Sequence, residues 1–226
     1  NCSLVGVFWG THTRREPELH AQNLKALFKL FDEGKIKPHV TELAGIERFT
    51  GGGAKPPVKV FDLPAASQFP AIARIPDKQL MVPEPGVINA MDSDKIYVED
   101  ASGQRSQVEG GQWPDMLGKA LQARITQSFE NAGYMKVVGQ QSDAFTADNQ
   151  LMIEVRRFVV LKAPTQKAVV ELAVRLLGQG GQIVASRTFR AEEPVAAIDA
   201  ASAAAGLRTA FTRLAAEVVA WTCASI

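Results

Sequence analysis

The residues that carry most side-chain chemistry near neutral pH are few in this chain and unevenly placed. All three histidines, His12, His20 and His39, lie in the first 50 residues, and the two cysteines, Cys2 and Cys223, stand near opposite ends. Histidine and activated cysteine carry out most acid–base and nucleophilic catalysis, and zinc sites use several of both. The histidines lack metal-ligand spacing. We therefore expect no catalytic, cofactor or metal site, and the sequence singles out no ligand-binding residue.

Three serines of the larger part of the chain, Ser142, Ser186 and Ser202, have no histidine to activate them after residue 50. A serine hydrolase needs a general base beside its nucleophile. A hydrolase triad is therefore excluded within that part, which is predicted to be non-enzymatic.

Four acidic residues, Asp92, Asp94, Glu99 and Asp100, lie close together in the sequence. Such a group could indicate a calcium loop, but the alternating order of acids before a glycine that supplies ligands around a tight turn is missing. These four residues are therefore expected to lie in a solvated loop.

Two arginine pairs also invite interpretation. Arg14 and Arg15, followed by an acid, are expected at a solvated helix start. Arg156 and Arg157 stand in the middle of an apparent strand, where successive side chains point to opposite faces. One guanidinium is therefore expected on each face of the sheet, and structural pairing with a carboxylate is favoured over ligand binding.

Composition is that of a globular chain with a full core: 226 residues, 46% hydrophobic, 22% charged, and a net charge of +1. No strong positive field or Lys/Arg cluster would attract nucleic acid. The longest apolar stretches, about ten residues, are too short to span a bilayer. The residues contain no leader with a basic start and an apolar run. We expect the chain as it stands to be soluble, without a signal peptide.

A run of glycine and proline at residues 51–57 divides the chain. Such a segment cannot form a core element and is typical of a tether. We therefore expect three parts: residues 1–50, the tether, and a folded domain over residues 58–226.

Residues 1–50 have the pattern of strand, helix and strand. Residues 2–10 form an apolar run typical of a buried strand. A helix is expected from residue 16, with Leu24, Leu27, Phe28 and Phe31 on one face and Gly34 as its stop. A short strand is expected over residues 36–42.

These residues resemble the C-terminal end of zinc-free NADPH:quinone oxidoreductases of the medium-chain dehydrogenase superfamily. The resemblance rests on residues 5–10 (VGVFWG), 14–18 (RREPE) and 33–38 (EGKIKP). It implies the last strand and helix of a nucleotide-binding domain. No G-x-G-x-x-G phosphate loop occurs in these 226 residues, so we expect no NADPH binding.

The folded domain is expected to begin with short strands at residues 58–63, 72–75, 79–82 and 95–98. A helix follows Trp113 and Pro114 and is closed by Gly133. Three longer strands are expected at residues 151–161, 167–177 and 182–190. Their short connections predict an antiparallel meander.

The final helix has the most regular pattern in the chain. Seven apolar residues step by four and three positions: Ala200, Ala204, Leu207, Phe211, Leu214, Val218 and Trp221. This stripe is expected to pack on the sheet, because two or three heptads are few for a specific coiled coil.

Residues 58–221 resemble the ABC-type transport auxiliary lipoproteins, which accompany lipid transport systems with mammalian-cell-entry (MCE) substrate-binding subunits in Gram-negative bacteria. The resemblance rests on Trp113–Pro114 before a helix, on the run from Ala147 into Arg156–Arg157, on Phe189 before a proline, and on the alanine-rich last helix. It implies a periplasmic, outer-membrane lipoprotein whose partners are an MCE subunit and an ABC permease and ATPase, with lipid and a homo-oligomer as further possibilities. The family's lipidated cysteine has no counterpart before Gly51, where Thr50 stands.

The expected fold is therefore α+β, with an antiparallel-rich sheet and two long helices on one face, preceded by a strand–helix–strand fragment. The expected function is that of a non-enzymatic auxiliary subunit in lipid transport. A quinone oxidoreductase fragment and a generic α+β interaction module are the alternatives. The first 50 residues are interpreted as a fusion, natural or artificial.

Overall fold

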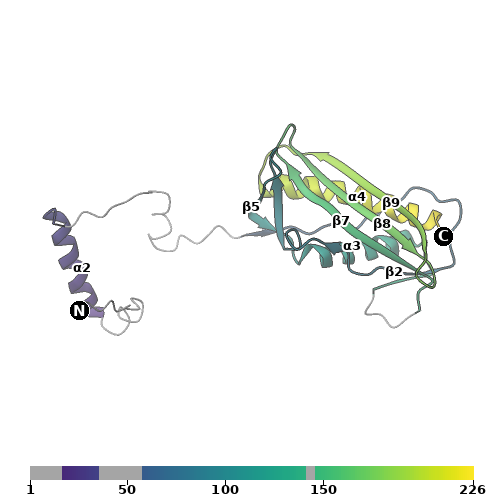
Figure 1. Cartoon of the computed structure of the whole chain (residues 1–226), viewed down its shortest axis with the longest axis horizontal. Coiled ribbons are helices and arrows are strands. Elements are labelled where there is room, and N and C mark those ends of the chain that lie inside the picture. The colour runs from purple at the N-terminus through teal and green to yellow at the C-terminus, as the bar shows by residue number, and fades with distance from the viewer. Residues whose placement is uncertain (1–16, 36–57, 141–145) are drawn as a thin grey trace. The chain divides into compact units, whose positions relative to one another are not determined.

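The computed structural model describes residues 17–35, 58–140 and 146–226, and the chain divides into two units after residue 53, each of which is described by itself (Figure 1). The first unit contributes helix α2 (Pro17–Asp32), which confirms the expected helix. It is followed by Gly34 with φ of +70°, the left-handed conformation expected of a stop. The strands expected at residues 2–10 and 36–42, together with His12 and His39, lie outside the described residues.

The expected apolar residues all lie on helix α2, and their side chains are exposed. Leu24, Leu27, Phe28 and Phe31 are between 36% and 64% exposed. His20 lies on the same helix and is half-buried.

The second unit contains nine strands and two helices within residues 58–140 and 146–226. In chain order they are β1 (Lys59–Val60), β2 (Gln79–Met81), β3 (Gly86–Val87), β4 (Lys95–Glu99), β5 (Arg105–Gln112), α3 (Leu117–Ala132), β6 (Val137–Gly139), β7 (Asn149–Leu161), β8 (Lys167–Leu177), β9 (Ile183–Pro194) and α4 (Ala200–Ala224). The strands form one sheet.

Strand β7 is the centre of the sheet. Along one edge it pairs with β8, which in turn pairs with β9, and both ladders are antiparallel over their whole length. Along its other edge β7 meets three short strands in succession, β2, β3 and β4, all parallel to it. Strands β6 and β5 extend the sheet beyond β2 and β4, and β1 borders β5.

The α+β class and the antiparallel meander of the last three strands are confirmed. The sheet as a whole is mixed, because the short strands run parallel to β7. Both long helices cover one face of the sheet, where α4 lies against β8 and β9 and α3 lies beside α4 (Figure 1).

A β-bulge in β7 overturns the expectation for the two central arginines. The register with β8 shifts between Val155 and Arg157, so one extra residue is accommodated there. Val155 and Phe158 are both buried in the core, three positions apart instead of two. Arg156 and Arg157 therefore both lie on the face without helices, and Arg157 pairs with Glu99 at 3.5 Å.

The ends of both long helices follow from their flanking residues. The Asp199 carboxylate accepts hydrogen bonds from the main-chain N–H groups of Ala201 and Ser202 at the start of α4, both at 2.9 Å. Hydrogen bonding lowers the pKa of Asp199 below its usual 3.8, and the bond from the N–H of Ser202 has the largest effect. Helix α3 ends at Gly133, whose φ of +64° is the expected left-handed cap.

The core lies between the sheet and the two helices. Leu207, Phe211, Leu214 and Val218, the expected stripe of α4, are at most 1% exposed. Trp113, Phe158 and Phe211 form a chain of edge-to-face rings, with centroids 5.8 and 6.4 Å apart.

Several of the expected short strands are wrong or incomplete. No strand forms at residues 72–75, and β1 covers only two residues of the expected 58–63. The reason is that the segment after β1 leaves the sheet and runs along α3, where three prolines (Pro64, Pro70 and Pro76) provide no N–H for a ladder. Strands β3, β5 and β6 were not expected.

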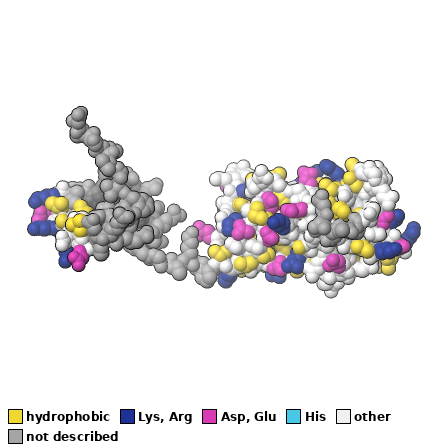
Figure 2. All heavy atoms as spheres, turned by 90° about the horizontal axis from the view of Figure 1, so that it is seen from below, with side chains coloured by type: hydrophobic (Ala, Val, Ile, Leu, Met, Phe, Trp, Pro, Cys, Tyr) yellow, Lys and Arg dark blue, Asp and Glu magenta, His cyan; other side chains and the backbone are white. Residues whose placement is uncertain are grey.

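The described helices include none that is both long enough and apolar enough to cross a bilayer. On the face of the second unit seen in Figure 2, positive and negative side chains are interspersed. This arrangement agrees with the net charge of +1 and with the absence of a single strong field.

Candidate functional site

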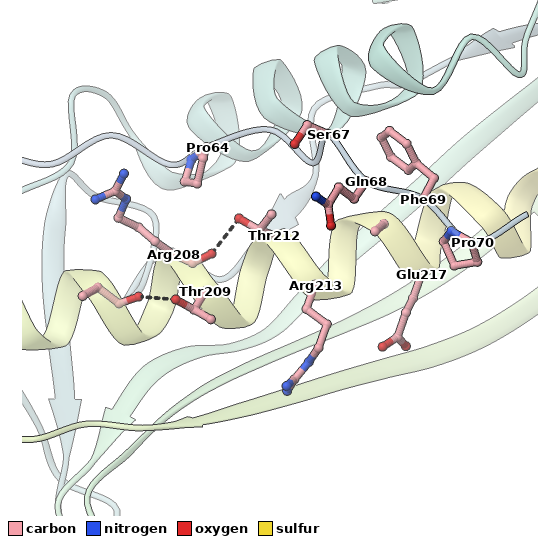
Figure 3. A pocket seen from close by; sticks show the side chains of 12 residues that line it. Pro64, Ser67, Gln68, Phe69, Pro70, Arg208, Thr209, Thr212, Arg213 and Glu217 are labelled. Carbon is pink, nitrogen blue, oxygen red and sulfur yellow. Dashed lines mark hydrogen bonds between the residues drawn. The ribbon is translucent and has the colours of Figure 1, made fainter.

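A groove of about 830 Å³ lies between α4 and the segment of residues 64–70 (Figure 3). Its volume falls within the range of roughly 300–1,000 Å³ that is typical of small-molecule sites. It is larger than two other hollows of the second unit, of about 330 and 290 Å³. We take it as the candidate functional site.

One wall of the groove is the outward face of α4, formed by small residues on successive turns. Ala205, Thr209, Thr212 and Ala216 line it at spacings of four, three and four. The hydroxyl of Thr209 donates to the Ala205 carbonyl at 3.1 Å, and that of Thr212 to the Arg208 carbonyl at 2.9 Å (Figure 3). Because the hydroxyl protons are directed into the helix, this wall presents mainly methyl groups.

The opposite wall is an extended segment that α3 holds in place. The main-chain N–H of Ala66 donates to the Ser128 hydroxyl at 2.9 Å, and the Asn131 side chain donates to the Ala66 carbonyl at 2.8 Å. Further along, the Tyr134 hydroxyl donates to the Pro70 carbonyl at 3.3 Å. Two side chains of α3 and one just after its end thus fix a segment that has no ladder of its own.

The apolar part of this wall comes from rings. Pro64, Phe69 and Pro70 line the groove, and the Phe69 ring lies edge to face with Tyr134, with centroids 6.1 Å apart. Ser67 and Gln68 add polar groups between them. An apolar chain or ring would lose water contact on both sides of this groove.

Charged groups stand on the helix side of the groove. Arg208 makes no ion pair with any residue in the described ranges, whereas Arg213 pairs with Glu193 and donates to the Glu192 carbonyl at 3.0 Å. Glu217 lies one turn beyond Arg213. The groove therefore combines apolar walls with an available cation, an arrangement suited to binding an amphiphile.

Among the described residues that line the groove, no histidine stands beside a hydroxyl. The hydroxyls of Thr209 and Thr212 donate to main-chain carbonyls, and residues 58–226 contain no histidine. The one cysteine of residues 58–226, Cys223, is buried in the core. This burial raises the pKa of its thiol to about 11. Such a thiol is protonated at neutral pH and inert.

The serines considered from sequence lie apart from one another. Ser186 is exposed on β9, and Ser202 donates to the capping carboxylate of Asp199 at 2.8 Å. Ser142 lies outside the described residues. The structure does not bring these serines together into a site.

The four neighbouring acids have separate structural roles. Asp92 accepts from the N–H of Gly118 at the start of α3, and Asp94 pairs with Lys95 at 3.1 Å. Glu99 takes part in an ion pair on β4, and Asp100 accepts hydrogen bonds within the turn that follows. The hydrogen bond from the Ser102 hydroxyl has the largest effect on the pKa of Asp100, and together with bonds from neighbouring N–H groups it lowers this pKa below 3.8. No grouping of metal-ligand side chains is found in the described residues.

The groove was missed from the sequence, although one signal for it exists. The outward face of the last helix carries alanine and threonine at heptad-like spacing opposite its buried stripe. A solvent-facing helix surface is usually rich in long charged residues, so a row of small ones indicates close approach by another group. The wall from residues 64–70 could not be placed without the fold.

The sequence and the fold can be compared with known proteins. Residues 61–219 match the family of ABC-type transport auxiliary lipoprotein components. A crystal structure of a protein from Xanthomonas campestris superposes with a TM-score of 0.69 at 27% identity, covering 74% of this chain and 95% of that one. The chain belongs to the ABC-type transport auxiliary lipoprotein family, whose members are auxiliary components of ABC-type transport.

Two further relatives match the chain over very different lengths. An uncharacterized protein of Bradyrhizobium diazoefficiens is 31% identical over 180 residues, which are 80% of this chain and 49% of that protein. The chain thus spans about half the length of this relative. A quinone oxidoreductase-like protein 2 homolog of Nematostella vectensis is 33% identical over 49 residues, 21% of this chain and 13% of that protein.

Proposed function

We propose that this protein is a non-enzymatic auxiliary subunit of an ABC transport system that moves lipid through the Gram-negative envelope, working with an MCE-type substrate-binding subunit and the transporter's permease and ATPase. Membership of the auxiliary lipoprotein family supports the transport role and a place in the envelope. The lipid and the MCE partner are the parts that we add.

The observation that carries the lipid assignment is the groove between α4 and residues 64–70. Its walls are methyl groups and rings, and Arg208 offers a positive charge beside them. An apolar chain with an anionic head would be held by burial along the walls and by this guanidinium. The lining residues of α4 run from Arg208 to Glu217 along the groove (Figure 3), so an extended apolar chain could lie beside the helix.

Two variants test the groove directly. Thr212→Trp and Ala216→Trp place a large ring in the groove without touching the buried stripe of α4. Binding of a fluorescent anionic phospholipid should be lost in both, and a matched control, Lys119→Trp on the exposed side of α3, should bind as the original chain does. Equal lipid binding by all four proteins would remove the groove from the proposal.

The transport role needs a test in cells. The domain, expressed behind a lipoprotein signal peptide with a Cys directly before Gly51, should fractionate with membranes and restore a strain that lacks its own auxiliary lipoprotein. Subunits of the transporter should co-purify with it. If the anchored protein reaches the membrane but neither restores the strain nor retains a transporter subunit, the lipid-transport assignment gives way to a generic interaction module.

The short match to a quinone oxidoreductase-like protein favours a second origin for the first 50 residues, and we propose that this part is a fusion without oxidoreductase activity. The matched segment is 49 residues long, and the chain contains no glycine-rich phosphate loop. Titration with NADPH should show no binding tighter than about 100 μM, which corresponds to roughly −5.5 kcal/mol.

A further inference from the structure

We propose that the first half of strand β9, residues 183–188, is a docking edge for an extended acidic segment of a partner protein. This edge is on β9, away from the groove, and the inference does not depend on lipid transport. It rests on three observations: an edge strand with one half left open, exposed apolar side chains on that half, and cationic side chains beside it.

Strand β9 is an edge of the sheet. In the described parts of the chain it pairs with β8 only, through an antiparallel ladder that runs along all of β9. About half of the main-chain N–H and C=O groups of an edge strand point away from the sheet and can pair with another strand. Proteins usually block such edges with charges, proline or covering side chains.

The second half of β9 is blocked in this way. Arg213 of α4 donates to the main-chain carbonyl of Glu192 at 3.0 Å, and Pro194 ends the strand without an N–H. The Glu192 carboxylate binds Lys167 and Arg190, both at 2.6 Å. The hydrogen bond from Lys167, then that from Arg190, lowers the pKa of Glu192, so its charge persists.

The first half of β9 lacks this protection. No hydrogen bond from outside the sheet reaches its main chain in the described ranges. Ile183 and Val184 are 61% and 47% exposed, which is unusual for apolar side chains at an open edge. Ser186 and Thr188 are also exposed and offer hydroxyl groups.

A shallow depression of about 330 Å³ lies beside this half of the strand, on the face of the sheet without helices. It is lined by Ala173 and Arg175 of β8, by Arg156 of β7 and by Ser186 and Thr188 of β9, and the small side chain of Ala173 leaves room between the two neighbouring strands. Arg156 is on this face because Val155 before it faces the core, and the bulge brings Arg157 to the same face.

The charges of this depression are largely available. Arg156 is exposed and pairs with no residue in the described ranges. Arg175 reaches Glu154 only at 3.9 Å, and both side chains are more than half exposed. Arg187 pairs in register with Val174 of the core, so its side chain lies on the opposite face of the sheet, where the guanidinium is 4.8 Å from the centroid of the Phe189 ring. Arg156 and Arg175 against the single carboxylate of Glu154 give the depression an excess of positive charge.

This excess decides between the possible occupants. A second copy of β9 would bring a second set of the same arginines to the contact, and like charges oppose such pairing. A bilayer surface would not use the main-chain groups of the edge. An extended segment with carboxylates satisfies both features: it adds a strand to β9 and directs acidic side chains toward Arg156 and Arg175.

The test uses the whole chain and a short fluorescein-labelled peptide of alternating valine and glutamate, followed by anisotropy. Binding should weaken when glutamine replaces glutamate and also when proline replaces alternate valines, because proline removes N–H groups. Raising the salt concentration should weaken it as well. Equal binding by the glutamine or proline peptide would overturn the charge or the strand-addition part of the proposal, respectively.

A charge swap makes the test specific for this surface. Arg156→Glu together with Arg175→Glu should lose the glutamate peptide and gain a peptide with lysine in place of glutamate. Singly, Arg175→Ala should weaken binding by up to about fivefold, the range of one exposed ion pair. Lys119→Glu on α3 is the matched control and should change neither peptide's affinity, and thermal melts should show that all variants are folded.

The other occupants give distinguishable results. If vesicles containing phosphatidylglycerol bind the chain, and the double variant abolishes this binding while no peptide binds, the surface belongs to a membrane and the proposal is wrong. If the chain forms dimers that Val184→Lys dissociates, and the glutamate peptide does not compete, the edge pairs with its own copy. Either outcome leaves the lipid groove on α4 untested, so the two proposals fail separately.

Discussion

Phe158 on β7 and Phe211 on α4 lie edge to face with their ring centroids 6.4 Å apart, directly after the bulge that sets the inward direction of Phe158. This contact joins the last helix to the central strand. Both rings are almost fully buried. It therefore identifies Phe211 as the residue through which the packing of α4 is best measured.

Phe211→Ala is expected to lower the free energy of unfolding by about 3–5 kcal/mol, because it removes a buried ring and leaves a cavity. Arg208→Ala, three residues earlier on the exposed face of the same helix, should change it by no more than about 0.5 kcal/mol. Urea denaturation of both variants measures the difference. Small and equal effects would mean that α4 is not packed on the sheet in solution.

Gly206 tests how closely α4 approaches the sheet. A Cβ at this position would lie 2.7 Å from Cγ2 of Val195 and 3.1 Å from Cβ of Ala168. Alanine would favour the helix by about 1 kcal/mol, whereas overpacking of a close contact costs about 1–3 kcal/mol. We expect Gly206→Ala to destabilise the domain, since the clash involves strand and loop atoms that cannot easily move.

The matched control for Gly206 is Ala205→Ser on the adjacent, exposed position of the helix. It should alter the denaturation midpoint only slightly. A midpoint that rises in Gly206→Ala would show that helix propensity outweighs the contact and that α4 sits further from β8 than the structure places it.

Glu192 should make part of the free energy of unfolding depend on pH in the acidic range. The hydrogen bonds from Lys167 and then Arg190 hold its pKa below the usual 4.5 in the folded protein. A lowered folded-state pKa gives stability that is fully present above 4.5 and is lost as the pH falls through the folded value. Glu192→Gln should therefore be less stable at neutral pH and should lose less stability on acidification.

Thermal melts from neutral pH to about pH 3 follow this dependence. Glu130→Gln, an exposed acid on α3, is the control and should leave the curve unchanged. A curve for Glu192→Gln that parallels the original over the whole range would contradict the assigned role of the Lys167–Glu192–Arg190 network.

Residues 58–226 are expected to fold without the preceding part of the chain. Every residue of the core cluster lies within residues 61–226, and the sheet with its two helices encloses that core. A protein beginning at Val58 should show a cooperative melt with the denaturation midpoint of the whole chain. Loss of cooperativity would mean that the first 57 residues belong to the core, against the proposed division into domains.

The sequence was informative where the structural signal is local. The stripe on α4 and the alternation in β7, β8 and β9 arise from periodicities of 3.6 and 2 that need no knowledge of partners. The left-handed caps at Gly34 and Gly133 likewise depend on a few neighbouring residues. These elements were predicted within a few residues of their observed bounds.

The features that the sequence did not predict depend on contacts between residues that are far apart in the chain. Strand β5 contains glycines and polar residues and forms because β4 and β1 lie on either side of it. The bulge at Arg156 depends on how β7 is aligned with β8, which single-strand alternation cannot show. The groove needs the segment of residues 64–70 to be bound by α3, more than fifty residues later. None of these can be read from a local pattern.

The three short parallel strands along β7 bear on how the chain acquires its structure. Leu80 of β2 pairs with Asn149, Gly86 of β3 with Glu154, and Val98 of β4 with Val160, so each strand meets its partner only after some 60 to 70 intervening residues have been made. The β7–β8–β9 meander and α4, by contrast, are contiguous in sequence and can assemble first. A chain emerging from its N-terminus therefore exposes unpaired strand segments for much of its synthesis, and its yield should depend on factors that hold it until β7 is available.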